Sequence, residues 1–367
     1  MIETLLRLRD RIVAGVDGPL FAVAMLILAV GLATLFSASG ENVARFGAQV
    51  FNIAVAIAVM WLTAQIPPQT LMRAAVPVYA IGLLLLVAVA VHGDVVNGAR
   101  RWLNLGFTRV QPSELMKLAT PLMLAWYFDQ RTTALRLRDW LIAAVILGVP
   151  VLFIVRQPDL GTALLVAAAG CYVIFLAGLS WVVISGMLVA GLASLPLVWH
   201  VMHGYQRRRL LTLIDPSSDP LGSGYHIIQA TIAVGSGGIL GKGWLQGTQS
   251  HLDFIPERAT DFIFAVFSEE FGLLGNTVLL VLYALLIGRG LMIALAAPTT
   301  FARLLAGGIV LTFFTYVFVN MGMVSGILPV VGVPLPLISY GGTSLVTLFL
   351  GIGMLMSIYR HRRLVQT

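Results

Sequence analysis

Ten apolar runs, most of them about 20 residues long, constrain this sequence more than any other feature, because a run of that length crosses the hydrocarbon core of a bilayer as one helix. Of the 367 residues, 59% are hydrophobic and 11% are charged, and the mean hydropathy is +0.94. These values exclude a soluble globular protein. The runs cover residues 19–39, 47–65, 74–92, 112–128, 139–155, 161–178, 181–201, 262–288, 303–325 and 343–359.

The runs are continuous rather than alternating, so they predict helices and not the strands of a membrane β-barrel. We therefore expect an all-α polytopic membrane protein, a single domain over residues 1–367 with about ten transmembrane helices. The run over residues 19–39 is too long for the core of a signal peptide, which predicts an uncleaved first span. The one cysteine, Cys171, lies inside an apolar run, which excludes a disulfide within the chain and predicts a small core residue.

The basic residues predict the orientation of the spans, since cytoplasmic loops carry an excess of Lys and Arg. With ten spans both termini lie on the same side of the membrane. The arginines of the terminal segments and of the alternate loops place that side in the cytoplasm; they are Arg7, Arg9, Arg11, Arg73, Arg131, Arg136, Arg138, Arg289, Arg303, Arg360, Arg362 and Arg363. The longest connection, residues 202–261, is then the one long extracytoplasmic loop.

Three arginines in a short connection on the opposite face, Arg100, Arg101 and Arg109, do not follow this rule. We interpret them as part of an outward-facing cationic site for an anionic ligand. Guanidinium groups beside Trp102 suit bidentate binding of phosphate, and a simple anchor at the membrane interface is the alternative. The formal net charge of +7 does not indicate nucleic acid, because the basic residues are spread over many short loops.

A charged segment at residues 251–270 contains the strongest candidate for a catalytic group. Thr260 is positioned to cap a helix, and Asp261 would lie in its first turn, where the helix dipole favours a carboxylate. The following residues enter an apolar run, so Asp261 is expected where a polar loop meets a membrane helix. A carboxylate at that boundary is costly unless it is used or paired.

Two further acids and a lysine fall close to the expected outer face. Glu114 and Lys117 are three residues apart on one helix face, and each would cost about 2.5–3.5 kcal/mol at the centre of the bilayer. They either serve the site or form an ion pair that only joins helices. Asp159 lies in a broken passage marked by Pro158 and Gly161, where it is either a buried functional acid or a turn residue that caps a helix.

Two loops leave similar alternatives open. The glycine-rich residues 235–243 either need tight turns or let backbone N–H groups and Lys242 approach an anion. The spacing of this loop does not fit a P-loop, because Ser236 and Gly243 stand where that motif requires Gly and Ser or Thr. The proline-rich stretch that leads to Ser339 needs protein or water around its backbone, so it either lines a substrate or caps the bundle.

Six segments, taken in this order over ten spans, carry a resemblance to a known family. They are residues 98–102, 111–117, 156–164, 219–244, 254–272 and 335–344. With them the sequence resembles the shape, elongation, division and sporulation (SEDS) family, and it is more similar to the elongation members than to the division members. The resemblance extends over nearly the whole chain.

This resemblance implies a peptidoglycan glycosyltransferase that polymerises lipid II for cell elongation and rod shape and releases undecaprenyl diphosphate. Asp261 matches the essential acid of the family, and we infer that it acts as the general base, assisted by a divalent cation (Mg or Mn). The implied partner is a class B penicillin-binding protein, a transpeptidase. The implied location is the bacterial cytoplasmic (inner) membrane, with the active site on its extracytoplasmic face.

The expected substrate-binding residues combine the charged groups of that face, because a diphosphate leaving group needs cations where charge develops. They are Arg100, Arg101, Trp102, Glu114, Lys117, Asp159, Arg207, Arg208, Lys242, Glu257, Arg258 and Ser339. The alternative function is a lipid II flippase or transporter, which many spans, broken segments and intramembrane charges also fit. A flippase predicts charges along a path across the bilayer, whereas most of these gather near one face.

Overall fold

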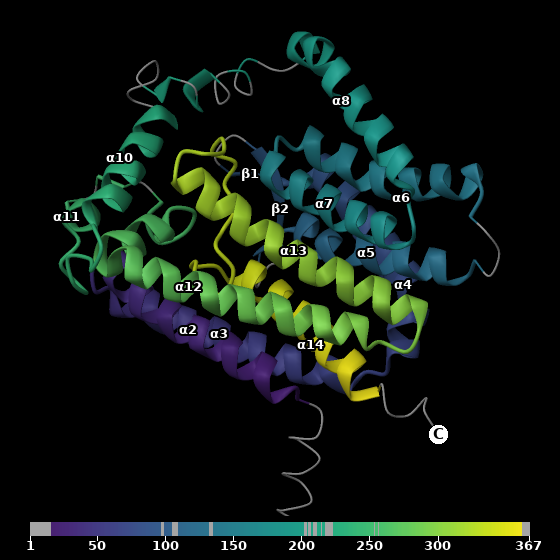
Figure 1. Ribbon diagram of the computed structural model, residues 1–367, viewed down its shortest axis with the longest axis horizontal. Helices are drawn as coiled ribbons and strands as arrows, with labels where there is room; N and C mark the ends of the chain where they lie inside the picture. The colour runs from purple at the N-terminus through teal and green to yellow at the C-terminus, as the bar shows by residue number, and fades with distance from the viewer. Residues whose placement is uncertain are drawn as a thin grey trace, which may run out of the picture.

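The computed structural model describes residues 16–96, 99–104, 109–131, 135–201, 204, 207, 211–213, 215–216, 223–252, 254–255 and 257–361 (Figure 1). Each of the ten predicted runs falls on a helix of its own, which confirms the all-α membrane fold. The helices are α2 (Gly18–Ala38), α3 (Val43–Gln65), α4 (Pro68–His92), α5 (Pro112–Asp129), α6 (Leu137–Arg156), α7 (Leu160–Leu176), α8 (Trp181–Val201), α12 (Ile263–Leu295), α13 (Thr300–Val324) and α14 (Gly342–His361).

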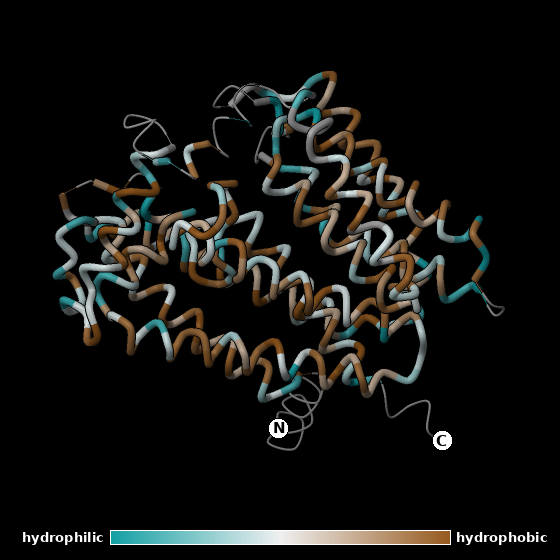
Figure 2. The backbone as a smooth tube through the Cα atoms, turned by 45° about the horizontal axis from the view of Figure 1, so that its top comes forward, coloured by the Kyte–Doolittle hydropathy of each residue, from teal (hydrophilic) through white to brown (hydrophobic). Residues whose placement is uncertain are grey.

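In the described part of the chain, seven of these helices are long and apolar enough to cross a membrane. The sequence of α5 carries three charged residues, and α7 is only 17 residues long. The number of spans and their orientation therefore stay predictions. Hydrophobic residues run along the helices in Figure 2, and hydrophilic residues gather where the helices end.

Capping side chains explain where several helices begin. Asp17, Asn42, Asp159 and Thr299 each accept a hydrogen bond from a backbone N–H group in the first turn of the helix that follows. These N–H groups have no partner inside the helix, and buried orphans would be costly. Pro112 occupies the first position of α5, where its missing N–H is not needed.

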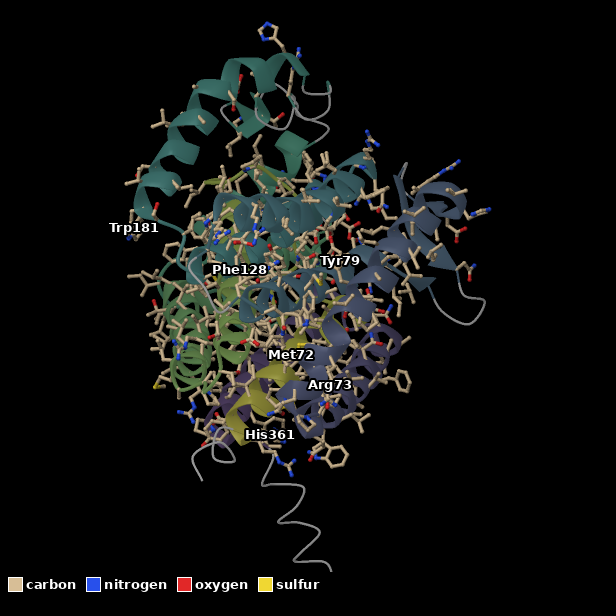
Figure 3. All side chains as sticks on the ribbon, turned by 90° about the vertical axis from the view of Figure 1, so that its right-hand side faces the viewer. Met72, Arg73, Tyr79, Phe128, Trp181 and His361 are labelled. Atoms are coloured by element: carbon tan, nitrogen blue, oxygen red, sulfur yellow. The ribbon has the colours of Figure 1, made fainter. Side chains whose placement is uncertain are left out.

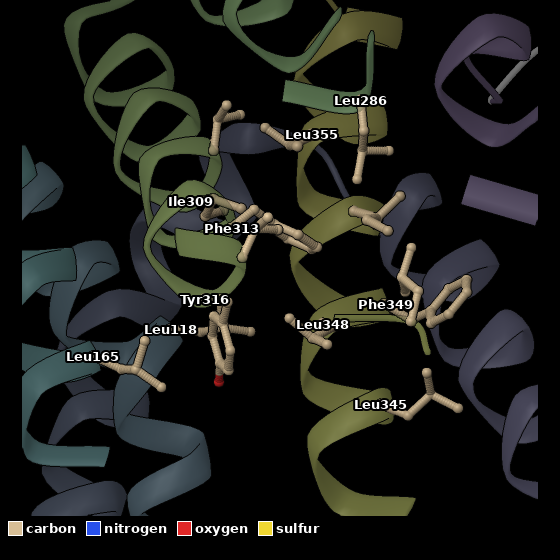
Figure 4. Packing of buried hydrophobic residues seen from close by; sticks show 14 of the residues in the cluster. Leu118, Leu165, Leu286, Ile309, Phe313, Tyr316, Leu345, Leu348, Phe349 and Leu355 are labelled. Carbon is tan, nitrogen blue, oxygen red and sulfur yellow. The ribbon is translucent and has the colours of Figure 1, made fainter. Parts of the chain in front are cut away.

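Helix α13 lies at the centre of the bundle, in contact with α5, α7, α12 and α14. It is also the most buried of the seven apolar spans. Figure 4 shows the packing between α13 and α14, where Ile309 and Phe313 face Leu348 and Leu355. In a bilayer such helices associate through close packing and hydrogen bonds, because lipid tails are as apolar as leucine. Helix α8 extends away from the rest of the bundle (Figure 1).

One end of the bundle, which we call the terminal end, joins the first and last described helices. Arg289 of α12 donates to both carboxylate oxygens of Asp17, at 3.0 and 2.6 Å, and its guanidinium lies 5.3 Å from the ring centre of Tyr359 on α14. Figure 3 looks onto this end, where Met72 and His361 line one pocket. The start of α2 and the end of α14 therefore lie on the same side of the bundle, as an even number of spans requires.

We expect Asp17→Asn to lower the stability of the fold without changing the chemistry at the opposite end. The Asp17 side chain is fully buried, and breaking a buried pair by removing one partner costs about 3–5 kcal/mol. Thermal unfolding of the purified protein in detergent would measure the loss. Activity per folded molecule should stay at the wild-type level. A loss of activity at unchanged stability would contradict the structural role that we assign to Asp17.

Three features differ from the sequence-based expectation. A small antiparallel sheet, β1 (Asp94–Val96), β2 (Ala99–Asn104) and β3 (Arg109–Val110), joins α4 to α5; strands this short leave no periodicity in the sequence. Helix α12 is broken at Gly272, whose φ of 64° and ψ of −163° are accessible to glycine. Cys171 is exposed on the surface of α7 rather than in the core, because an apolar side chain in a membrane helix has lipid as an alternative environment.

The loop predicted over residues 202–261 contains two helices in its described part. Helix α10 (Ser223–Ser236) comes first, and α11 (Thr248–His251) follows the glycine-rich residues. Helix α10 packs against α12 and, more lightly, against α13. We call this end of the bundle, with the 254–262 turn and the 331–341 loop, the loop end.

Candidate active site

Asp261 lies in a turn that leads into α12, at the loop end of the bundle. It was predicted in the first helical turn, but the helix begins two residues later, at Ile263. Thr260 does not cap the helix, because its hydroxyl donates to the backbone and the carboxylate of Glu257 instead. Asp261 is half-buried, so its carboxylate is placed at the boundary between the bundle and its surroundings.

The 331–341 loop forms one wall beside the Asp261 carboxylate. A β-carbon at Gly332 would lie 3.2 Å from Asp261 Oδ2, and Gly332 has a φ of +72°. The missing side chain therefore leaves room at this point of the wall. On its other side the loop meets α7, where a β-carbon at Gly161 would lie only 2.5 Å from the Val331 carbonyl oxygen. The start of α7 and the Asp261 turn thus flank the same short segment.

Hydrogen bonds fix the Asp261 turn to this loop. The Asn320 side chain of α13 donates to the Asp261 carbonyl at 2.8 Å and to the Val333 carbonyl at 2.6 Å. Ser339 Oγ donates to the Thr260 carbonyl at 2.7 Å. The backbone N–H of Tyr340 donates to the carbonyl of residue 259 at 2.9 Å. The backbone around the carboxylate is therefore held from two elements.

Ser339 belongs to this scaffold. Its hydroxyl also accepts from the Leu335 N–H at 2.7 Å, and the residue is only 6% exposed. The proline-rich stretch was expected either to line a substrate or to cap the bundle. These contacts favour the structural role for Ser339 itself. The 331–341 loop that Ser339 closes lines the Asp261 carboxylate.

Glu114 and Lys117 form the ion pair that their spacing predicts. Lys117 Nζ lies 2.6 Å from Glu114 Oε1, and both residues are buried. The ammonium also lies 5.0 Å from the ring centre of Tyr316 on α13. Tyr316 is one helical turn before Asn320, on the same face of α13. The ion pair and the Asp261 turn are thus attached to consecutive turns of one helix.

Figure 4 shows Tyr316 at the edge of the apolar cluster, beside Leu118, with its hydroxyl directed away from the leucines. Glu114 Oε2 is buried without a hydrogen-bond partner. A buried carboxylate oxygen in that condition has acceptor capacity to spare.

Arg101 and Asp159 meet between the small sheet and α7. Arg101 donates to the carbonyls of Gln157 and Pro158, at 3.3 and 2.6 Å, and lies 4.0 Å from the Asp159 carboxylate. Asp159 accepts from Gln111 Nε2 at 2.9 Å and from the Thr162 N–H at 3.2 Å. The last contact shows that Asp159 caps α7, one of the two roles considered. The neighbouring guanidinium is one-third exposed, so it retains a face toward the exterior.

The glycine-rich loop packs against the break in α12. Lys242 and Gly243 donate their backbone N–H groups to the carbonyls of residues 269 and 270, and the N–H groups of residues 273 and 274 donate to the carbonyls of 238 and 239. The loop thus replaces the hydrogen bonds that the break at Gly272 removes. A β-carbon at Gly241 would lie 2.1 Å from the carbonyl oxygen of residue 270, so close backbone approach explains the glycine.

Lys242 takes part in this packing through its side chain. Its Nζ lies 2.7 Å from Oε1 of Glu269, which has no exposed surface, and 2.8 Å from the Thr248 hydroxyl. The tight-turn interpretation of residues 235–243 therefore fits the structure, and the charge of Lys242 is compensated by a buried acid.

The remaining candidates lie around these clusters. Arg100 and Glu257 are exposed, and Trp102 is half-buried. Arg258 lies beside the turn between α2 and α3, where its guanidinium is 3.7 Å from a β-carbon built on Gly40. Arg207 donates to the carbonyl of His200 at 2.7 Å. Arg208 lies outside the described residues.

Sequence reasoning did not single out Asn320, Tyr316, Gln111 or Glu269 as site residues. Asn320 had a usable signal, since a lone amide in an apolar helix tends to hydrogen-bond to a neighbouring segment. Arg45 was not singled out as a site residue either, and its guanidinium lies 5.3 Å from the ring centre of Tyr340, next to Ser339.

The arrangement places the half-exposed carboxylate of Asp261 on a fixed backbone. The buried pair of Glu114 and Lys117 is attached one turn away along α13, and the Arg101 guanidinium lies at the start of α7. Among the described residues no three His, Cys, Asp or Glu side chains are grouped to hold a metal ion. This is a membrane-embedded protein with a group of polar side chains at one end, around the half-exposed Asp261. Such a site suits a substrate that is itself anchored in the membrane.

The comparison with known proteins identifies the family. The chain belongs to the cell cycle protein family of FtsW, RodA and SpoVE, the SEDS family, whose model matches residues 18–364. It is 51% identical over 350 residues to the peptidoglycan glycosyltransferase MrdB of Escherichia coli, with 95% of each chain covered. It is 39% identical to the stage V sporulation protein E of Bacillus subtilis, with 77% of each chain covered.

Two solved structures share the fold. A chain of a peptidoglycan synthase complex that coordinates polymerisation and crosslinking matches with a TM-score of 0.83 and 37% identity, covering 94% of this chain and 98% of that chain. The rod shape determining protein RodA of Thermus thermophilus matches with a TM-score of 0.72 and 32% identity, covering 94% and 97%. The resemblance stated from the sequence motifs is therefore confirmed.

Proposed function

We propose that this protein is a peptidoglycan glycosyltransferase that polymerises lipid II into glycan strands for cell elongation. The observation that carries the proposal is the position of Asp261, a half-buried carboxylate on a backbone held by Asn320 and Ser339. The same activity is named for the relative that is 51% identical. A lipid-linked substrate also accounts for a polar site at the end of a membrane bundle.

In this proposal Asp261 is the general base. It accepts the proton of the 4-hydroxyl of an acceptor GlcNAc as that oxygen forms a bond to the anomeric carbon of a donor MurNAc. The bond from that carbon to the diphosphate oxygen breaks, and undecaprenyl diphosphate leaves with the electron pair. A positioned base contributes about 10²–10⁴ to a rate. Arg101 and Arg258 are the guanidinium groups that we assign to the departing diphosphate.

We place the site on the extracytoplasmic face of the bacterial inner membrane. The support is the positive-inside pattern of the sequence, together with the described arginines at the terminal end, Arg73, Arg289 and Arg360. A class B penicillin-binding protein is the partner that we propose. One structural neighbour belongs to a complex that couples polymerisation to crosslinking, which is the pairing that this partnership requires.

A divalent cation fits this site only together with substrate. Mg²⁺ is usually bound through one or two carboxylates and substrate phosphates rather than by a cage of protein ligands. Asp261 would be the protein ligand, and the ion would supply charge compensation for the leaving diphosphate. The other described side chains of the site would bind and orient the substrate without the cation.

Removal of divalent cations is expected to lower polymerisation at least about tenfold, because the diphosphate charge is then met by arginines alone. Glycan-chain synthesis in EDTA, followed by addition of excess MgCl₂ or MnCl₂, measures the effect. Binding of labelled lipid II in EDTA provides the control for loss of fold. Full activity in EDTA would remove the cation from the proposal and leave the base assignment in place.

The test of the function uses purified protein, labelled lipid II and the isolated partner transpeptidase. Glycan chains that lysozyme digests are the expected product. The transporter alternative predicts movement of labelled lipid II across vesicles that contain the protein, with no chains under any partner or metal condition. Glu114 and Lys117 argue against that alternative, because these two buried charges neutralise each other.

A further inference from the structure

Asn320 stands out among the residues to which the proposed chemistry gives no role. It has no exposed surface, and it lies in the apolar helix α13 near the loop end. Both hydrogens of its side-chain amide are used, one on the carbonyl of Asp261 and one on the carbonyl of Val333. Its Oδ1 atom is buried without a hydrogen-bond partner.

The two bonds of Asn320 join the two segments that bound the Asp261 carboxylate. One acceptor is the backbone of Asp261 itself. The other is the residue after Gly332, whose absent side chain leaves room beside Asp261 Oδ2. Two carbonyl groups cannot bond to each other, so a donor with two hydrogens is needed between them, and a neutral amide is the uncharged side chain that provides it.

We propose that Asn320 is a positioning residue for Asp261, which sets the distance between that carboxylate and the loop that faces it. This inference rests on the proposed role of Asp261 as the base. A misplacement of about 1 Å at a reacting group can reduce a rate about 100-fold. An amide that only joined helices would stabilise the fold, but the reaction rate would not depend on its position.

The experiment compares Asn320→Ala and Asn320→Gln with Asn276→Ala in the full-length protein, assayed with labelled lipid II and the partner transpeptidase. Asn276 is the matched control, since it accepts a hydrogen bond from Ser268 at 3.0 Å in α12, away from the Asp261 turn. Asn320→Ala should lower kcat about 100-fold with little change in KM. Asn320→Gln keeps both donors and should retain more activity than the alanine variant.

A second arm tests whether Asn320 acts through Asp261. In an Asp261→Glu background the carboxylate is already displaced, so Asn320→Ala should cost much less than in the wild type, a non-additivity expected of coupled residues. Equal losses in both backgrounds, or a loss of kcat matched by Asn276→Ala, would assign Asn320 a structural role and overturn the proposal.

Amide hydrogen exchange supplies a readout that does not depend on activity. In either Asn320 variant that folds, residues 257–262 and 331–340 should exchange faster together, while the terminal end keeps its protection. Unchanged exchange in both segments would show that the amide does not join them, and would also overturn the proposal. Full activity of Asp261→Asn would instead refute the base assignment, with the exchange result still deciding the contact made by Asn320.

Discussion

Asp261→Asn is expected to abolish glycan-chain formation while the protein stays folded and bound to its partner. The amide has nearly the shape of the carboxylate but cannot accept the proton of the acceptor hydroxyl. The backbone bonds from Asn320, Ser339 and Tyr340 do not involve the side chain, so the turn should keep its place. Loss of a positioned base reduces a rate about 10²–10⁴-fold, which the conversion of labelled lipid II on gels resolves.

Asp94→Asn is the control for this experiment, since Asp94 lies in β1 and has no role in the proposed chemistry. Its glycan synthesis should equal that of the wild type. Partner binding and thermal unfolding of Asp261→Asn should also match the wild type. Chains made at full rate by Asp261→Asn would keep the enzyme and move the base elsewhere. A pure scaffold protein would make no chains in any variant.

Most of the membrane fold could be predicted because it depends on local sequence. A continuous apolar run excludes water along its whole length, and a helix is then the structure that satisfies its own backbone. The ten runs accordingly fall on ten helices. Helix ends and interruptions within helices were predicted less well. The hydropathy of residues 262–288 gives no sign that α12 is interrupted at Gly272. The hydrogen bonds lost at this break are replaced by a loop about thirty residues earlier in the chain.

In the candidate site, too, local features could be predicted from the sequence and contacts between distant elements could not. The contact between Glu114 and Lys117 follows from helix spacing alone, and the capping role of Asp159 follows from its place before α7. The role of Lys242 could not be derived, because its partner Glu269 belongs to a different element. Asn320 was missed for the same reason, since both of its acceptors are backbone carbonyls that only the folded chain brings together.

The buried pair of Glu114 and Lys117 gives the other large expected effect. Glu114→Gln alone leaves Lys117, which is 3% exposed, without its counter-charge, and breaking a buried pair in this way costs about 3–5 kcal/mol. Lys117→Met alone leaves a buried carboxylate and should be equally harmful. Yield and activity would then fall together in either single variant, and neither result would separate a structural role from a functional one.

The double variant Glu114→Gln/Lys117→Met separates the two roles. Replacing both charges of a buried pair by neutral groups is often neutral for stability, so yield and Tm should return close to the wild type. We expect polymerisation to stay at least about tenfold reduced, because the site then lacks a cation and an acceptor oxygen one turn below the Asp261 turn.

Asp17→Asn/Arg289→Met is the matched control, since it neutralises a buried pair at the terminal end and should leave polymerisation unchanged. If the Glu114→Gln/Lys117→Met variant polymerises lipid II at the wild-type rate, the pair only joins helices. In that outcome Arg101 and Arg258 keep the role assigned to them at the leaving diphosphate, and Lys242 stays paired with Glu269.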